Sequence, residues 1–308
     1  MPTKSNNPAD YIQPLNMNGL EGRMLHMPHP KGGKRELLFI YGHHSSIERW
    51  WGIAKFLNRY CAVTMPDLPG MGGMDSFYSI GKKPSLDNFA DYMAAFIKLR
   101  YKRKRVTIVG MSFGFILATR MLQRYPELAK KVDMLVSFAG FAHHNDFAFP
   151  KWEWLSYKFI ARTLTFRVPA TIFRNVFLHS RIIRSSYKFS NNAKFRGVTG
   201  EELEEISRFE ITLWHVNDVR TWGYTLNEFL KLDNTRVHID MPVHHMAVKG
   251  DHYFNNYHVE QHFRVVFKEF YLLAELDLHN HAPSVIADEK SAGVFVPPKL
   301  RRLLQKSS

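Results

Sequence analysis

The sequence predicts an α/β fold in which a mostly parallel central sheet is flanked by helices. Short apolar runs typical of buried strands alternate with amphipathic helical stretches along the chain. A serine between two glycines turns one of these strands directly into a helix. The length of 308 residues and the 45% share of hydrophobic residues are sufficient for one large buried core.

The first clear strand is Glu36 to Tyr41, and a helix that contains Trp50 and Leu57 follows it. The loop between them starts Gly42-His43-His44. Two adjacent histidines rarely ligate one ion when no cysteine or carboxylate stands beside them. The sequence therefore predicts no metal here.

The next strand, Tyr60 to Met65, contains the single cysteine, Cys61. We interpret Cys61 as a small core residue, and no disulfide can form within the chain. A glycine-containing loop, residues 66–73, follows the strand but lacks the spacing of a phosphate cradle. We expect a structural turn in which Asp67 holds backbone amides, and no cofactor.

The serine is Ser112, between Gly110 and Gly114. Val106 to Val109 read as a fully buried strand, and the apolar positions after the serine recur at helical spacing up to Pro126. A strand that reverses straight into a helix crowds its own backbone, so small neighbours are needed and the serine is pushed outward in a strained conformation. Ser112 is the candidate nucleophile. The first amide of the helix, on Phe113, would meet an anion that forms beside it.

These motifs resemble the α/β-hydrolase superfamily, and the resemblance covers roughly residues 20–145 and 235–305. It implies the order serine, acid, histidine along the chain. The strand from Val243 to Val248 is followed by Asp251, which is where the family places its acid. Asp146, after the strand Val132 to Ala139, is the alternative acid.

A helix over about residues 259–268, an apolar run over 270–276 and a final helix after Pro297 complete the predicted core. The resemblance places the histidine in the loop after the last strand. His281 fits better than His279, which stays the alternative. The resemblance also implies that the backbone N–H of His43 is the second oxyanion donor, although this chain has Tyr41-Gly42 where the family more often has His-Gly.

The segment from 141 to 234 falls where the family commonly inserts a helical lid, so we expect a core of residues 1–140 and 235–308 with a lid between them. Residues 151–200 contain ten Lys or Arg and one acid, and thus carry much of the net charge of +14. Ile172, Val176, His179 and Ile183 fall on one helical face and Arg174 and Arg181 on the opposite one. A basic amphipathic lid helix follows from this spacing. Three roles stay open for the lid: simple packing on the core, contact with anionic membrane, or capture of an anionic substrate such as an acyl-phosphate.

The resemblance and the residues together predict a serine hydrolase that cleaves an ester-like bond, with a small-molecule acyl substrate of apolar or aromatic character. A C–C bond hydrolase or an acyltransferase with the same triad is an alternative, because fold and triad are shared. A non-catalytic protein that binds a lipid or a partner through the lid is a second one. Serine at the nucleophile position disfavours dehalogenase and epoxide-hydrolase chemistries, which use aspartate there in this family.

The polar N-terminus lacks an apolar signal core, and no stretch reaches the roughly 18–20 apolar residues of a membrane span. We therefore expect a cytoplasmic protein that can lie peripherally on a membrane. Nucleic-acid binding is disfavoured, because the basic run 98–105 precedes a central strand at the end opposite the serine and reads as a solvated rim.

Overall fold

The structure is a computed structural model that describes residues 7–179, 182–183, 200–278, 281 and 292–306. Its centre is an eight-stranded sheet in the order β1-β2-β4-β3-β5-β6-β7-β8. The strands are β1 (Ile12–Met17), β2 (Leu20–Met27), β3 (Glu36–Ile40), β4 (Ala62–Pro66), β5 (Val106–Met111), β6 (Val132–Phe138), β7 (Ile239–Val248) and β8 (Phe267–Leu276). The β1–β2 and β2–β4 pairs are antiparallel, and every pair from β4 to β8 is parallel. The predicted α/β fold with a mostly parallel sheet is confirmed.

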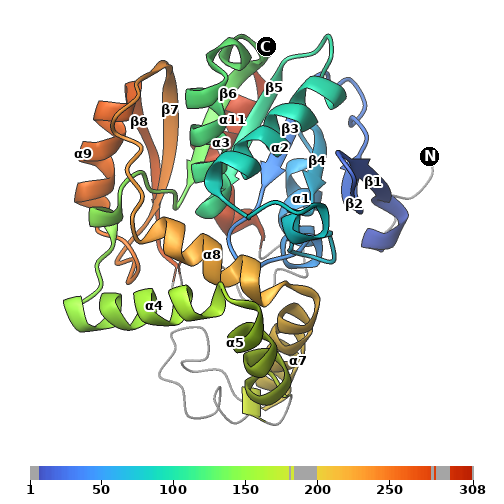
Figure 1. Ribbon diagram of the computed structural model, residues 1–308. Helices are drawn as coiled ribbons and strands as arrows, with labels where there is room; N and C mark the ends of the chain where they lie inside the picture. Colours follow the sequence, from blue (N-terminus) through green and yellow to red (C-terminus); the bar gives the residue numbers. More distant parts are fainter. Residues whose placement is uncertain (1–6, 180–181, 184–199, 279–280, 282–291, 307–308) are drawn as a thin grey trace.

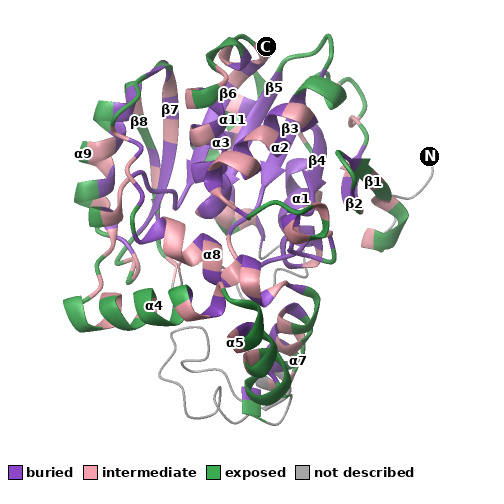
Figure 2. Cartoon of the chain, in the orientation of Figure 1, coloured by how far each residue is buried: buried purple, intermediate pink, exposed green. Residues whose placement is uncertain are grey.

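Helices cover both faces of the sheet (Figure 1). One face carries α2 (Leu86–Arg100), α3 (Phe113–Arg124) and α9 (Asn256–Val266), and the other carries α1 (Trp51–Leu57) and α11 (Pro298–Gln305). Phe115 of α3 packs on Phe263 of α9 with ring centroids 5.1 Å apart, and Arg301 of α11 lies over the ring of Phe56 of α1 at 4.9 Å. The central strands β3, β4 and β5 are buried along their whole length, as Figure 2 shows, because both of their faces are covered.

Cys61 lies in this core, at the start of β4, as expected. Its side chain is buried, and burial raises the pKa of the thiol to about 12. The basic run 98–105 is exposed except for Tyr101, which agrees with a solvated rim.

Between β6 and β7 the described chain forms α4 (Lys151–Leu164), α5 (Arg167–Ile172), α7 (Gly200–Val216) and α8 (Val219–Phe229), which we call the inserted helices. Figure 1 shows them gathered at one end of the sheet. They have a small core of their own, formed by Leu164, Ala170, Leu178, Ile183 and Val219.

The structure does not keep Ile172, Val176 and Ile183 on one common face, as the spacing predicts. Ile172 and Val176 are 52% and 51% exposed, whereas Ala170 and Leu178 are buried. The chain changes from α-helix to a π-helical turn at Phe173–Phe177. A π turn adds a residue to the turn, so the residues after it are rotated relative to the positions that regular helical spacing predicts. Of the other predicted positions, Ile183 is buried, His179 is exposed and Arg181 lies outside the described residues.

Candidate active site

Ser112 occupies the sharp turn between β5 and α3. Its backbone angles are φ 48° and ψ −111°, and its amide donates to the carbonyl of Phe138 on the neighbouring strand over 2.9 Å. A positive φ in a residue with a side chain is strained, and it persists only where the surroundings enforce it. The strained turn that the sequence predicts at Ser112 is thus present.

The two glycines around Ser112 are required by close backbone contacts. A Cβ on Gly110 would lie 2.5 Å from the Cα of Phe115, and one on Gly114 would lie 2.0 Å from the carbonyl oxygen of Ile40. A side chain at either position would therefore clash with backbone atoms unless the backbone moved. The absence of side chains therefore lets α3 start directly against the end of β3, beside the loop that begins at Gly42.

Asp251 and His281 come together in a hydrogen-bonded pair. Asp251 follows β7, and its Oδ2 accepts from the Nδ1 of His281 over 2.6 Å while its Oδ1 accepts from the amide of Tyr253 over 2.8 Å. The Asp251 side chain is 2% exposed and that of His281 is 11% exposed. A proton held on Nδ1 by the carboxylate leaves the lone pair on Nε2, which is the form that a general base needs.

Ser112 and His281 line the same cavity but do not hydrogen-bond to each other. The Nε2 of His281 is buried and has no hydrogen-bond partner among the described residues. In unliganded enzymes such catalytic hydrogen bonds are often long and tighten when substrate binds.

The alternative acid, Asp146, lies elsewhere. Its Oδ1 accepts from Nδ1 of His262 over 2.5 Å, and its Oδ2 accepts from the amides of Ala142 and His143. Asp146 is fully buried and thus holds a local turn and a different histidine. The structure pairs His281 with Asp251, not with Asp146; the alternative histidine, His279, lies outside the described residues.

The two predicted oxyanion donors flank Ser112. Phe113 is the first residue of α3, so its amide has no acceptor inside the helix. His43 lies in the loop after β3, and Gly42, His43 and Ser112 line one cavity. No acceptor for either amide is recorded within the described residues. The backbone N–H groups of Phe113 and His43 could therefore both donate to an oxygen atom placed beside Ser112.

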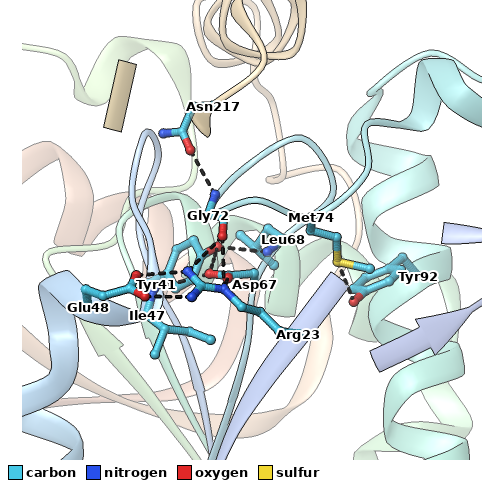
Figure 3. A network of polar contacts seen from close by, with 10 residues as sticks. All are labelled: Arg23, Tyr41, Ile47, Glu48, Asp67, Leu68, Gly72, Met74, Tyr92 and Asn217. Carbon is cyan, nitrogen blue, oxygen red and sulfur yellow. Dashed lines mark hydrogen bonds and ion pairs between the residues drawn. The ribbon is translucent and has the colours of Figure 1, made fainter. Parts of the chain in front are cut away.

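A polar network around Asp67 links the segments that follow β3 and β4 (Figure 3). Asp67 is fully buried, and its carboxylate accepts from the hydroxyl of Tyr41 over 2.8 Å, from the amide of Ile47 over 3.2 Å and from Nε of Arg23 over 2.7 Å. Asp67 therefore does hold a backbone amide, as expected. Burial raises the pKa of Asp67 to about 7, against the opposing effects of Arg23 and Tyr41.

Asn217, at the end of α7, joins the inserted helices to this network. Its Oδ1 accepts from the amide of Gly72 over 2.8 Å, and its Nδ2 lies 3.1 Å from Nδ1 of His44. The His43 ring contacts α8, because its Nε2 lies 2.7 Å from Oγ1 of Thr225. Burial lowers the pKa of His43 to about 3, so the ring is neutral at physiological pH.

The cavity has a volume of about 390 Å³ and mostly aromatic walls. Its described lining includes Phe141, Phe147, Phe149, Trp214, Trp222, Phe229 and Phe254. Two charged side chains, Arg49 and Glu210, also line it, and neither belongs to the site that the sequence predicts. The available signal was Glu48-Arg49 between the apolar residues Ile47 and Trp50, in the segment after the loop that begins at Gly42. Within the described part of the chain, no three His, Cys, Asp or Glu side chains are placed to hold a metal ion.

Comparisons with known proteins agree with the fold. Residues 37–263 match the family model of the alpha/beta hydrolase fold. A thermophilic esterase from Thermogutta terrifontis superposes with a TM-score of 0.60 at 12% identity, covering 96% of this chain and 100% of that one. An enol-lactonase from Burkholderia xenovorans LB400 gives 0.61 at 13% identity, with coverages of 92% and 96%. The epoxide hydrolase CorEH gives 0.63 at 15% identity, with coverages of 92% and 95%. A search of the curated proteins finds no match.

Proposed function

The chain belongs to the alpha/beta hydrolase fold family, and on that premise we propose that it is a serine hydrolase acting on an ester-like bond through a covalent acyl-enzyme. The observation that carries the proposal is the strained Ser112 turn facing the same cavity as the hydrogen-bonded pair Asp251–His281. A nucleophile, a base and a carboxylate that orients the base are the parts that acyl transfer needs.

In the first step His281 Nε2 takes the proton of Ser112 as Oγ attacks the substrate carbonyl carbon. The carbonyl oxygen becomes an oxyanion between the amides of Phe113 and His43. Collapse of the tetrahedral intermediate expels the leaving alcohol, which receives the proton from His281. Water then attacks the acyl-enzyme by the same route, and the free acid leaves while Ser112 regains its proton.

The environment of each group favours these roles. The buried Asp251 carboxylate stabilises the imidazolium that forms on His281, and the amide of Tyr253 holds that carboxylate in place. Each oxyanion donor in such a site contributes about 3–4 kcal/mol to lowering the barrier. The aromatic walls favour an apolar acyl or aromatic substrate, and about 390 Å³ is enough for a small molecule.

The test is covalent labelling by a fluorophosphonate probe, followed by intact mass, because an activated serine reacts with it quickly. We expect rapid single labelling of the wild type and its loss in Ser112→Ala and His281→Ala. Unlabelled wild-type protein would contradict the mechanism and favour the non-catalytic binding role. Labelled protein would then be screened with p-nitrophenyl esters of increasing chain length.

Transfer to an acceptor alcohol and C–C bond hydrolysis use the same triad, so product analysis must separate them from ester hydrolysis. Esters that yield free acid at a rate independent of added alcohol would support hydrolysis. An acyl product whose amount rises with the alcohol would support the acyltransferase alternative.

We further propose that the inserted helices act as a lid over the cavity. We also propose that their outer face binds the cytoplasmic surface of an anionic membrane. Supporting this, α4 exposes Trp152, Leu155 and Phe159, which are 69%, 59% and 73% exposed and lie at helical spacing on one face. The basic residues Lys151, Lys158, Arg162 and Arg167 are exposed on the same helix and the start of α5. Among the described helices, none combines the length and apolar character needed to cross a bilayer.

Vesicle co-sedimentation tests the docking. We expect binding to vesicles that contain phosphatidylglycerol, weaker binding to pure phosphatidylcholine, and loss of binding at high salt, since each basic residue near the surface contributes about 1 kcal/mol. The triple variant Trp152→Ser, Leu155→Ser, Phe159→Ser should lose binding and keep its stability because these side chains are exposed. Equal sedimentation of variant and wild type would exclude this face.

A further inference from the structure

The cavity beside Ser112 contains one buried ion pair. Nη2 of Arg49 donates to Oε1 of Glu210 over 2.5 Å, and the two residues are 3% and 2% exposed. They are the only Asp, Glu, Lys or Arg among the described residues that line the cavity. Arg49 follows the oxyanion loop and Glu210 lies on α7, so the pair joins the core to the inserted helices at the substrate cavity.

Arg49 has more donors than the protein uses. A guanidinium carries five N–H groups. Within the described residues its recorded hydrogen bond is the one to Glu210, and its Nε is buried without an acceptor. The guanidinium also lies over the ring of Phe209, 5.4 Å from the centroid, which satisfies none of the in-plane donors. A buried donor without an acceptor destabilises the folded protein, and a ligand that supplies the acceptor removes this penalty.

Arg23 shows how this chain treats an arginine that is only structural. Its Nη1 and Nη2 bind both carboxylate oxygens of Glu48, its Nε binds Asp67, and the carbonyl of Gly72 accepts from it as well (Figure 3). Arg23 is absent from the cavity lining, and each of its three nitrogens has a recorded acceptor. The buried Nε of Arg35 also lacks a recorded acceptor, but Arg35 is absent from the cavity lining. Arg49 combines an unpaired Nε with a place in the cavity wall, where a ligand can bring the acceptor.

We infer that Arg49 is a specificity-determining residue that binds an uncharged oxygen acceptor of the substrate, an oxo or second ester carbonyl group, away from the bond that Ser112 attacks. The inference rests on the proposed function for the identity of that bond. The acceptor is uncharged because Glu210 already neutralises Arg49. A substrate carboxylate would be buried close to the carboxylate of Glu210, which is a costly arrangement of like charges.

Direct binding to Ser112→Ala tests the inference without requiring turnover. The probes are methyl 4-oxopentanoate and methyl 4-methylpentanoate, which have nearly the same shape and differ in the oxo group. Their Kd values are measured by calorimetry in Ser112→Ala and in the same protein with Arg49→Met and Glu210→Leu, which removes both charges and leaves no buried orphan. We expect the preference for the oxo ester to fall by about tenfold or more in the second protein, as for a hydrogen bond to a charged donor.

Arg49→Lys in the Ser112→Ala background is the second variant. Lysine keeps the positive charge opposite Glu210 but lacks the planar guanidinium, so the preference for the oxo ester should fall in this variant too. This variant tests the inference if the Arg49→Met, Glu210→Leu protein does not fold. An unchanged preference in the folded variants would overturn the inference and leave the pair as a tie between α7 and the core. Methyl hydrogen succinate carries a carboxylate in place of the oxo group. If it bound more tightly than the oxo ester, the inference that the acceptor is uncharged would be wrong.

The proposed function is judged separately. If the wild type resists the fluorophosphonate probe while the oxo preference and its dependence on Arg49 are found, the serine mechanism fails and the acceptor site stands. If the wild type is labelled but the two esters bind alike in Ser112→Ala, the mechanism stands and the acceptor site fails.

Discussion

Gly114→Ala is the sharpest test of how the nucleophile turn is built. The new Cβ would lie 2.0 Å from the carbonyl oxygen of Ile40, 2.6 Å from its carbon and 2.7 Å from the carbonyl oxygen of Tyr41. All three atoms are backbone, and an ordinary carbon–oxygen contact needs more than about 3 Å. Either α3 or the end of β3 must therefore move by about 1 Å. Overpacking of this kind costs about 1–3 kcal/mol or more, and a 1 Å misplacement in an active site costs about 100-fold in rate.

Gly42→Ala is the matched control, because its Cβ would meet the nearest atom, Sδ of Met111, at 3.4 Å. Urea denaturation gives the free energy of unfolding, and the rate of fluorophosphonate labelling reports on the site. We expect Gly114→Ala to have a lower free energy of unfolding and slower labelling than the wild type. Gly42→Ala should stay close to the wild type in its free energy of unfolding. Wild-type stability and labelling in Gly114→Ala would refute the assignment of the contact.

Three further outcomes follow from the geometry. Asp251→Asn should slow fluorophosphonate labelling by a factor on the order of 10³ or more, because the amide no longer holds the imidazole in its catalytic tautomer; labelling near the wild-type rate would reject Asp251 as the acid. Asn217→Ala should lower the free energy of urea unfolding by about 1–3 kcal/mol, because the buried amide of Gly72 loses its acceptor; the exposed Thr212→Ala on the same helix is the control, and equal losses in both would contradict the argument. Burial lowers the pKa of His245 to about 3, so the unfolded chain binds the extra proton between that value and its ordinary pKa of 6.5, and stability is lost as pH falls. From pH 7 to pH 5 this histidine should cost about 2 kcal/mol, and His245→Gln should lose that much less over the same interval, whereas parallel pH profiles would show that the ring is not held neutral.

The sheet and the nucleophile turn were predictable because their signals are local. Buried parallel strands are apolar throughout, and a glycine–serine–glycine turn follows from the steric needs of a few consecutive residues. The positions of Asp251 and His281 came from the resemblance. In the structure Asp251 and His281, 30 residues apart, form a hydrogen bond, whereas Asp146 forms one with His262. Sequence reasoning left that choice open, because both acids follow a strand of the same sheet.

The inserted helices were less predictable, since their details depend on tertiary packing. Regular helical spacing placed Ile172, Val176 and Ile183 on one apolar face. A π turn at Phe173–Phe177 breaks that spacing, and Ile172 and Val176 are exposed whereas Ile183 is buried. The Arg49–Glu210 pair joins residues 161 positions apart, and no local pattern marks such a pair.

The loop after β3, which begins at Gly42, is held both by the core and by the inserted helices. On the proposed function, this gives the inserted helices a part in positioning the oxyanion donor on His43. Asp67 binds the loop segment from the core through the amide of Ile47. From the insertion, Thr225 binds the ring of His43, and Asn217 binds His44. A backbone donor is useful only if it is placed before the charge develops, since that is what makes its stabilisation free of reorganisation. Because Thr225 and Asn217 contact His43 and His44 themselves, we expect a displacement of α7 or α8 to shift the amide of His43. Anything that reorients the inserted helices, a membrane surface included, is therefore expected to change the turnover number and not the Michaelis constant alone.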